Sequence, residues 1–297
     1  METSLRDRVF AVVCDNYYYP GLRALLPSIA AYHGLAIPVF LYHRNLSEGQ
    51  LQELGRQGVE LCLFGLEELP FPAPGMWEAK QQIFAHCIGR ARCVYLLDAD
   101  LVLVSAVDDV FELARMGRVV SSADGGGRIF GPEYAAYSPG LVGRCQPYVN
   151  SGALCLDVVR HWDLAGLWAF ASKYGAYSPG AGAPLGLPGH GDQGVFNAVA
   201  GVLGKAPLFH VLSEGTWCDS TRGCILRIRR RHQDGRLTVW NWTERTRQRL
   251  VHSSGPKWWT AEGATYLRQF GDKLRCFEHF LAQFGLHAQH GVLSVRT

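Results

Sequence analysis

The chain has 297 residues, of which 48% are apolar, so it can bury a sizeable core, and a mainly disordered protein is excluded. Its formal net charge is +3, and only 19% of its residues are charged. This balance argues against a polybasic nucleic-acid-binding or membrane-surface protein as the first interpretation.

The N-terminal half alternates between strand and helix patterns. Short apolar runs predict strands at 9–14, 37–42, 59–64 and 92–97, and helical spacing of apolar residues predicts helices at 20–33, 47–56 and 77–88. Ser47 is a suitable N-cap for the second of these helices. Strands that are separated by helices predict an α/β fold with a mostly parallel sheet, covered on both faces, whose ligands bind at the carboxyl ends of the strands.

The C-terminal half contains two long loops. Segments 125–147 and 174–191 are rich in Gly, Pro and Tyr, and we expect them to be functional loops on either side of a strand at 153–158. The pentapeptide AYSPG occurs in both, at 136–140 and 176–180, which we interpret as a coincidence of composition rather than a repeat architecture.

A basic hairpin and an amphipathic helix complete the predicted elements. Segment 225–242 alternates around a turn at Asp234-Gly235 and is expected to be a hairpin insertion, and residues 260–284 are expected to form one helix that packs on the domain. The hairpin carries Arg227, Arg229, Arg230 and Arg231. These arginines are either a solvated face or a basic edge that faces a phosphorylated or acidic acceptor.

We expect a single domain over 1–297, with a nucleotide-binding half at about 8–124, a sugar and acceptor half at 125–259 and the C-terminal helix at 260–285. The first residues do not resemble a secretory signal, and no apolar stretch is long enough to span a membrane, so the sequence predicts a cytoplasmic protein. The nine cysteines show no metal-ligand spacing and are interpreted as buried apolar residues.

Two carboxylates follow the strand predicted at 92–97. Asp98 and Asp100 are two residues apart, so both can point to one side of the strand end. Such a pair suits Mg²⁺ or Mn²⁺ that also binds diphosphate oxygens. The alternative is a simple turn with Asp98 as a helix cap, but two adjacent buried carboxylates are unfavourable without a cation.

Three further segments carry polar side chains of the kinds found in active sites. Asn150-Ser151-Gly152 precedes the strand at 153–158, Asp192-Gln193 lies between glycines before a helix expected near Val195, and the segment HSSGPKWW begins at His252. Each segment alone has an ordinary structural explanation, such as a capping residue or a surface lysine.

Taken together and in this order, over about residues 10–259, these segments resemble the glycogenin-like retaining glycosyltransferases of family 8, which have the GT-A fold. The resemblance implies that Asp98-Ala99-Asp100 binds Mn²⁺ and the diphosphate of a nucleotide-sugar donor. It also implies that His252 is a third metal ligand, with Gly255 and Lys257 at the phosphate. The match at Lys257 departs from the family pattern, because the segment is one residue shorter and Trp258 replaces a proline.

The same resemblance assigns the remaining donor contacts. Cys14-Asp15-Asn16-Tyr17-Tyr18 is similar to the segment that holds the base and ribose, with Tyr18 as the stacking ring, and Lys80 matches a cation that contacts the donor. Asn150, Ser151 and Gly152 would line the sugar pocket, and Asp192 and Gln193 would lie beside the anomeric carbon.

The implied reaction transfers a hexose from a nucleotide diphosphate, UDP-glucose or UDP-galactose, to a hydroxyl acceptor with retention of configuration. Asp192, Gln193 and Lys257 are the candidate catalytic residues. The acceptor, a saccharide, peptide or small molecule, and a possible homodimer are left open by the sequence.

Three other functions compete with this interpretation. Asp98 also fits the nucleophile motif of haloacid-dehalogenase phosphotransferases, although that motif normally follows the first strand of its domain. A sugar nucleotidyltransferase would need a Gly-rich basic loop after the first strand, where this chain has CDNYYYPG. A non-catalytic sugar-nucleotide-binding protein is the third alternative.

Overall fold

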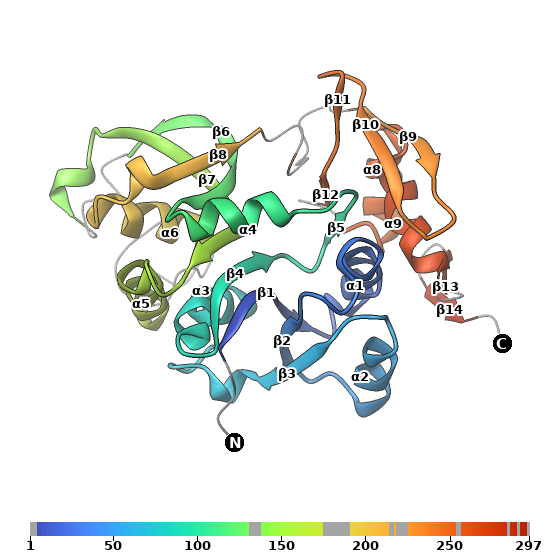
Figure 1. The fold of residues 1–297 in the computed structure, drawn as a ribbon, viewed down its shortest axis with the longest axis horizontal. Helices are drawn as coiled ribbons and strands as arrows, with labels where there is room; N and C mark the ends of the chain where they lie inside the picture. The colour runs from blue at the N-terminus through green and yellow to red at the C-terminus, as the bar shows by residue number, and fades with distance from the viewer. Residues whose placement is uncertain are drawn as a thin grey trace.

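The computed structural model describes residues 5–130, 138–174, 191–213, 217, 225–253, 257–283, 286–289 and 292–295. A seven-stranded sheet with strand order β3-β2-β1-β4-β7-β6-β8 forms the centre of the molecule (Figure 1). Its strands are β1 (Arg6–Asp15), β2 (Val39–Arg44), β3 (Leu61–Gly65), β4 (Ala91–Leu97), β6 (Val119–Ile129), β7 (Cys145–Asp157) and β8 (Phe209–Leu212).

The predicted mostly parallel α/β sheet is confirmed. Strands β1, β2, β3 and β4 are mutually parallel neighbours, whereas β7 runs antiparallel to both β4 and β6, and β8 is parallel to β6. The sequence missed β6 and placed only 153–158 in β7, because glycines such as Gly127 are typical of loops. In the structure Gly127 pairs with Pro147 in the extended β6–β7 ladder.

Helices cover both faces of this sheet. They are α1 (Tyr19–His33), α2 (Glu48–Gly55), α3 (Met76–Cys87), α4 (Asp108–Arg115), α5 (Trp162–Ala171) and α6 (Gly191–Val202). The predicted cap is confirmed: the Ser47 hydroxyl accepts a hydrogen bond from the Gln50 amide, and the Gln50 side chain accepts one from the Ser47 amide.

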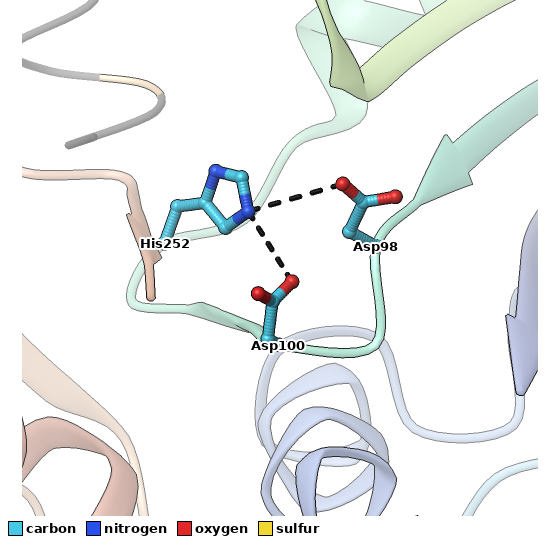
Figure 2. A group of neighbouring side chains, drawn as sticks. All are labelled: Asp98, Asp100 and His252. Carbon is cyan, nitrogen blue, oxygen red and sulfur yellow. Dashed lines mark ion pairs between the residues drawn. The ribbon is translucent and has the colours of Figure 1, made fainter. Parts of the chain in front are cut away.

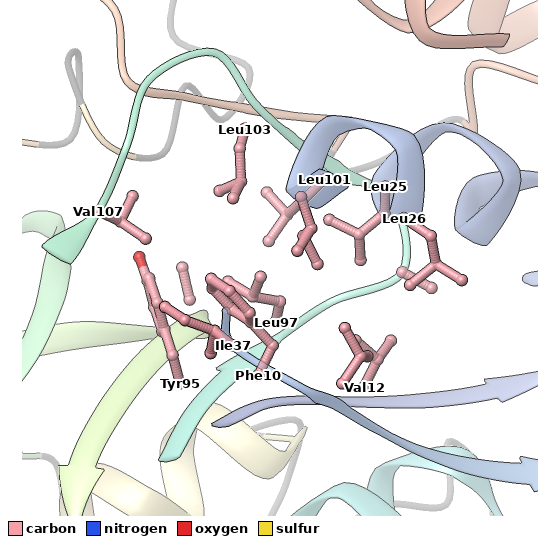
Figure 3. Packing of buried hydrophobic residues seen from close by; sticks show 14 of the residues in the cluster. Phe10, Val12, Leu25, Leu26, Ile37, Tyr95, Leu97, Leu101, Leu103 and Val107 are labelled. Carbon is pink, nitrogen blue, oxygen red and sulfur yellow. The ribbon is translucent and has the colours of Figure 1, made fainter. Parts of the chain in front are cut away.

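Two hydrophobic cores follow from the alternation of β1. Phe10 and Val12 face a core shared with α1, α2 and α4, whereas Val9 and Ala11 face a core shared with α3, α5 and α6. Figure 3 shows the first core, where Phe10 and Val12 meet Leu25 of α1. Because both faces are packed, the carboxyl edge of the parallel strands is held rigidly.

Smaller sheets flank the main one. Strands β5 (Leu101–Leu103) and β12 (Leu250–His252) pair antiparallel, and β13 (Leu286–Gln289) pairs with β14 (Val292–Val295). The predicted basic hairpin is confirmed as β9 (Leu226–Arg231) and β10 (Leu237–Asn241), to which β11 (Thr246–Arg247) adds a third strand. Gly235 adopts φ +82° in the hairpin turn, a conformation that suits glycine.

The prediction of one C-terminal helix is wrong, because two helices occupy that segment. They are α8 (Ala261–Arg268) and α9 (Lys273–Ala282). Gly271 separates them with φ +72°, and the Asp272 amide donates to the Leu226 carbonyl of β9. The chain therefore interrupts the amphipathic pattern in order to pair with the hairpin.

Two further expectations are only partly tested. All seven cysteines in the described part of the chain are free, and most are buried, but Cys145 is exposed and Cys62 is partly exposed, in contrast to the predicted burial. The second AYSPG segment, at 176–180, lies outside the described residues.

Among the described helices, none is long and apolar enough to cross a membrane.

Candidate active site

Three potential metal ligands meet beside the carboxyl end of β4. Asp98 directly follows β4, Asp100 directly precedes β5, and β12 places His252 opposite Leu101 of β5. The His252 Nε2 atom lies 3.2 Å from Asp100 Oδ1 and 3.8 Å from Asp98 Oδ2 (Figure 2). The pairing of β5 with β12 therefore joins residues more than 150 positions apart in the sequence.

The two carboxylates have opposite electrostatic environments. Burial raises the pKa of Asp98, and the neighbouring Asp100 raises it further, against the opposing effect of Lys80. Burial also raises the pKa of Asp100, but His252 and Lys257 outweigh it, so the pKa of Asp100 is lowered well below its usual value. Asp100 is only 2% exposed and stays ionised, so it offers a permanent negative charge to a cation.

Lys80 on α3 connects this group to a second acidic residue. Its Nζ lies 2.6 Å from Asp98 Oδ1 and 2.8 Å from Asp192 Oδ2. The Ser151 hydroxyl donates to the same Asp192 oxygen at 2.8 Å. Burial lowers the pKa of Lys80, but the two carboxylates outweigh burial and raise it, so this lysine remains a cation inside the protein.

Strand β7 brings the Asn150-Ser151-Gly152 segment against Asp98. The Asp98 amide donates to the Gly152 carbonyl at 2.8 Å, and the Asn150 side chain accepts from the Gly152 amide at 2.6 Å. A Cβ atom on Gly152 would lie 2.8 Å from Asp98 Oδ2 and 3.0 Å from His252 Cε1. Only glycine therefore fits at this point of β7 with the ligands in place.

Asp192 and Gln193 belong to the first turn of α6, which begins at Gly191 rather than near Val195 as predicted. The Gln193 side-chain oxygen accepts a hydrogen bond from the Ser151 amide at 3.3 Å. This helix start therefore fixes both residues against the same β7 segment.

Lys257 contacts the group of Asp98, Asp100 and His252 at Asp100. Its Nζ lies 2.5 Å from Asp100 Oδ2 and 5.5 Å from the centroid of the Tyr18 ring. Burial raises the pKa of Tyr18, and Asp100 and Asp98 raise it further, so its hydroxyl stays protonated. Gly255, which the sequence assigned to the phosphate, lies outside the described residues.

These side chains line one cavity of about 270 Å³. Its wall contains most of the residues predicted for the donor, the metal and the chemistry, namely Tyr18, Lys80, Asp98, Ala99, Asp100, Asn150, Ser151, Gly152, Asp192, Gln193, His252 and Lys257. Sequence reasoning missed Val13, Met76 and Trp77, which also line it. The position of Trp77 three residues before Lys80 on α3 could have indicated it, because residues at that spacing share a helix face.

The rest of the predicted base-binding segment does not line the cavity. Cys14 is buried in the core, which raises the pKa of its thiol, and Asp15 accepts hydrogen bonds from the amides of Tyr17 and Tyr18. Asn16 is exposed to solvent. In this segment Asp15 shapes the turn that presents Tyr18, and Tyr18 alone reaches the cavity wall.

The three ligands suit a hard divalent cation. One atom from each of Asp98, Asp100 and His252 can be chosen so that all lie within 4.8 Å of one another, and no other such group of His, Cys, Asp and Glu occurs in the described residues. Two carboxylates and an imidazole leave coordination positions for phosphate oxygens.

Solved structures with the same architecture are glycosyltransferases. The galactosyltransferase LgtC, in complex with donor and acceptor sugar analogs, is 14% identical, with a TM-score of 0.57 over 92% of this chain and 95% of that chain. The chain has the GT-A fold. The bifunctional glycosyltransferase WbbM shows the same GT-A architecture at 12% identity and a TM-score of 0.57, over 92% of this chain and 52% of that chain.

A third GT-A structure is a glutamine-to-glutamate active-site mutant of LgtC, 12% identical, with a TM-score of 0.52 over 88% of this chain and 94% of that chain. No protein-family model matches the sequence, and no curated protein matches it by sequence. The similarity to GT-A structures is therefore evident from the fold and not from sequence identity.

Proposed function

We propose that the protein is a metal-dependent glycosyltransferase that moves a sugar from a nucleoside diphosphate donor to a hydroxyl acceptor. The observation that carries the proposal is the meeting of Asp98, Asp100 and His252 at the carboxyl edge of a GT-A sheet, in a cavity that also holds two lysines. Ligands of open α/β sheets bind at this edge.

Asp98, Asp100 and His252 would hold Mn²⁺ or Mg²⁺. When bound, such an ion neutralises the charge that develops on a leaving diphosphate. Lys257 and Lys80 supply positive charge on either side of this group, since each already pairs with one of its carboxylates. These cations can shift from the carboxylates to phosphate oxygens without crossing bulk solvent.

The donor sugar would lie between β7 and the start of α6. Asn150 and Ser151 would contact its hydroxyls, and Asp192 and Gln193 would lie beside its anomeric carbon. Lys80 and Ser151 hold the Asp192 carboxylate, so Asp192 would position the substrate rather than attack it. Gln193 is the only glutamine that lines the described cavity, which agrees with the active-site glutamine named for LgtC.

Tyr18 would stack on the base, for which we propose uracil, and the donor would be UDP-glucose or UDP-galactose. The transfer would retain the anomeric configuration, with a leaving-group oxygen taking the proton of the acceptor hydroxyl on the same face. The cavity fits this route because the lysines and Asp192 surround the space where donor and acceptor would meet.

The phosphotransferase alternative is less well supported. Asp98 follows the fourth strand of the chain, whereas that motif normally follows the first strand of its domain.

The test is thermal stabilisation by a panel of nucleotide sugars, with and without Mn²⁺, followed by donor hydrolysis. A donor at 100 times its dissociation constant should add about 2.7 kcal/mol to the free energy of unfolding. We expect Mn²⁺-dependent stabilisation by a UDP-sugar, lost in Asp100→Asn and kept in the surface control Asp234→Asn. A lack of response to every nucleotide, combined with phosphatase activity on simple esters, would refute the proposal.

A further inference from the structure

The three-stranded sheet of β9, β10 and β11 has one buried and one exposed face. Leu226, Leu237 and Val239 point inward and pack with α8 and α9. Figure 1 shows this sheet apart from the main one, beside α8 and α9. Because strand residues alternate, Arg227 of β9 and Trp240 of β10 point to the opposite face. The register of the β9–β10 ladder shifts between Thr238 and Val239, and the adjacent Arg229 and Arg230 are both exposed there.

We call this opposite side the outer face; it consists of Arg227, Arg229, Arg230, Trp240, Trp242 and Arg247. Trp240 of β10 pairs with Arg227 of β9 on one side and with Arg247 of β11 on the other. Trp242 is 56% exposed, and the Arg229 guanidinium lies 5.2 Å from its ring centroid. The indoles therefore lie among guanidinium groups.

No carboxylate belongs to β9, β10 or β11. The acidic residues beside these strands have partners of their own. Asp234 pairs with Arg236 at 2.6 Å, and Glu244 accepts from the Ser213 hydroxyl at 3.4 Å. Asp272 accepts from the Ile228 amide of β9 at 3.0 Å and pairs with Arg275 at 3.1 Å. The net charge of +3 for the whole chain conceals this local concentration of positive charge.

We propose that the outer face docks on the surface of a lipid bilayer that contains anionic phospholipids. Arginines attract phosphate headgroups, and exposed tryptophans favour the boundary between headgroups and acyl chains. Each arginine contributes about a fivefold gain in partitioning onto an anionic surface.

A bilayer fits this face better than a single-stranded nucleic acid. The Arg229 guanidinium lies over one of the two faces of the Trp242 ring. An indole packed beside a guanidinium can still insert its edge between headgroups. The sheet is also only about 10 Å wide across its three strands, which matches a few headgroups rather than a groove along a polymer.

The test measures sedimentation of the full chain with phosphatidylcholine vesicles, with and without phosphatidylglycerol. The variant Arg227→Gln/Arg229→Gln/Arg230→Gln removes three charges from the outer face. The control Arg56→Gln/Arg118→Gln/Arg144→Gln removes three exposed charges elsewhere. A third variant, Trp240→Ala/Trp242→Ala, keeps the charge and removes the indoles, and thermal unfolding checks that each variant folds.

We expect binding only to the anionic vesicles, a loss of about a hundredfold in the first variant, and binding close to wild type in the control. Added salt should weaken the binding, and loss of the indoles should weaken it further at fixed charge. The proposal is overturned by no binding of the wild type, by an equal loss in the control, or by an oligonucleotide that binds the outer face more tightly than the vesicles do.

Discussion

Gly152→Ala should weaken metal binding at the candidate metal centre while leaving the fold intact. The added methyl group would lie 2.8 Å from Asp98 Oδ2, 2.9 Å from Asn150 Oδ1 and 3.0 Å from His252 Cε1. Ordinary contact begins near 3.4 Å, so the Asp98 carboxylate and the imidazole must each move by about half an ångström. Metal–ligand distances tolerate only about 0.2 Å.

We therefore expect Gly152→Ala to fold and to bind Mn²⁺ about 10- to 100-fold more weakly than the wild type, a loss of about 1.4–2.8 kcal/mol. All three contacts are made by side-chain atoms rather than backbone atoms, so stability without metal should fall by only about 1–2 kcal/mol. Calorimetric titration with Mn²⁺ alone measures the affinity, and it needs neither donor nor acceptor.

Gly166→Ala is the matched control, because Gly166 lies within α5 and a Cβ atom there would meet nothing within 4 Å. It should leave Mn²⁺ affinity unchanged and raise stability by about 1 kcal/mol, as alanine favours a helix interior. Wild-type Mn²⁺ affinity in Gly152→Ala would refute the inference that Asp98 and His252 bind one ion together.

Three other outcomes follow from the same structure. In urea unfolding, Gly271→Ala should lower the free energy of unfolding by about 3 kcal/mol, because Gly271 has φ +72° and its Cβ would lie 2.3 Å from a backbone oxygen. Gly143→Ala is the control: Gly143 has φ +77° but lies in open space, so this variant should lose only about 1 kcal/mol. Equal losses would contradict the role of the close approach. Burial lowers the pKa of His86 from 6.5 to about 4. The contribution of His86 to the free energy of unfolding should therefore be complete above pH 6.5 and fall by up to about 3 kcal/mol as the pH drops to 4. In urea unfolding, His86→Gln should lack this pH-dependent loss, because glutamine does not titrate. Lys80→Met should destabilise by about 2–4 kcal/mol at pH 8, because Asp98 and Asp192 lose their shared cation. The loss should be smaller at pH 5, because burial raises the pKa of Asp98 and its protonation removes one of the unpaired charges; a loss that grows at pH 5 would contradict this account of the ion pairs.

Much of the fold was predictable because its parallel half is built from local patterns. Apolar runs gave the edges of β1 to β4 within a few residues, and Ser47 marked the start of α2. The long antiparallel ladder of β6 and β7 was not predictable from glycine-rich sequence, since pairing between distant strands rather than propensity holds it extended.

The candidate site could also be predicted only in part. The motif order led to Asp98, Asp100 and His252, and the structure brings all three together, although their role as metal ligands remains our proposal. The ion pairs of Lys80 with Asp98 and Asp192 could not be predicted from spacing, because they depend on how α3 packs against β4 and α6. Trp77 was missed because the apolar spacing of its helix predicts core packing, whereas Trp77 is 43% exposed and lines the cavity.

A hydrophobic cluster links the sheet of β9, β10 and β11 to residues that adjoin the candidate active site. Leu226 and Val239 on the inner side of the sheet share this cluster with Val251 of β12 and with Trp258, next to Lys257. Gly263 of α8 also lies directly against the Lys257 backbone. Ala24 of α1 and Val102 of β5 belong to the same cluster, and β12 pairs with β5. A substitution that loosens the core beneath the hairpin should therefore also loosen the strand that carries His252.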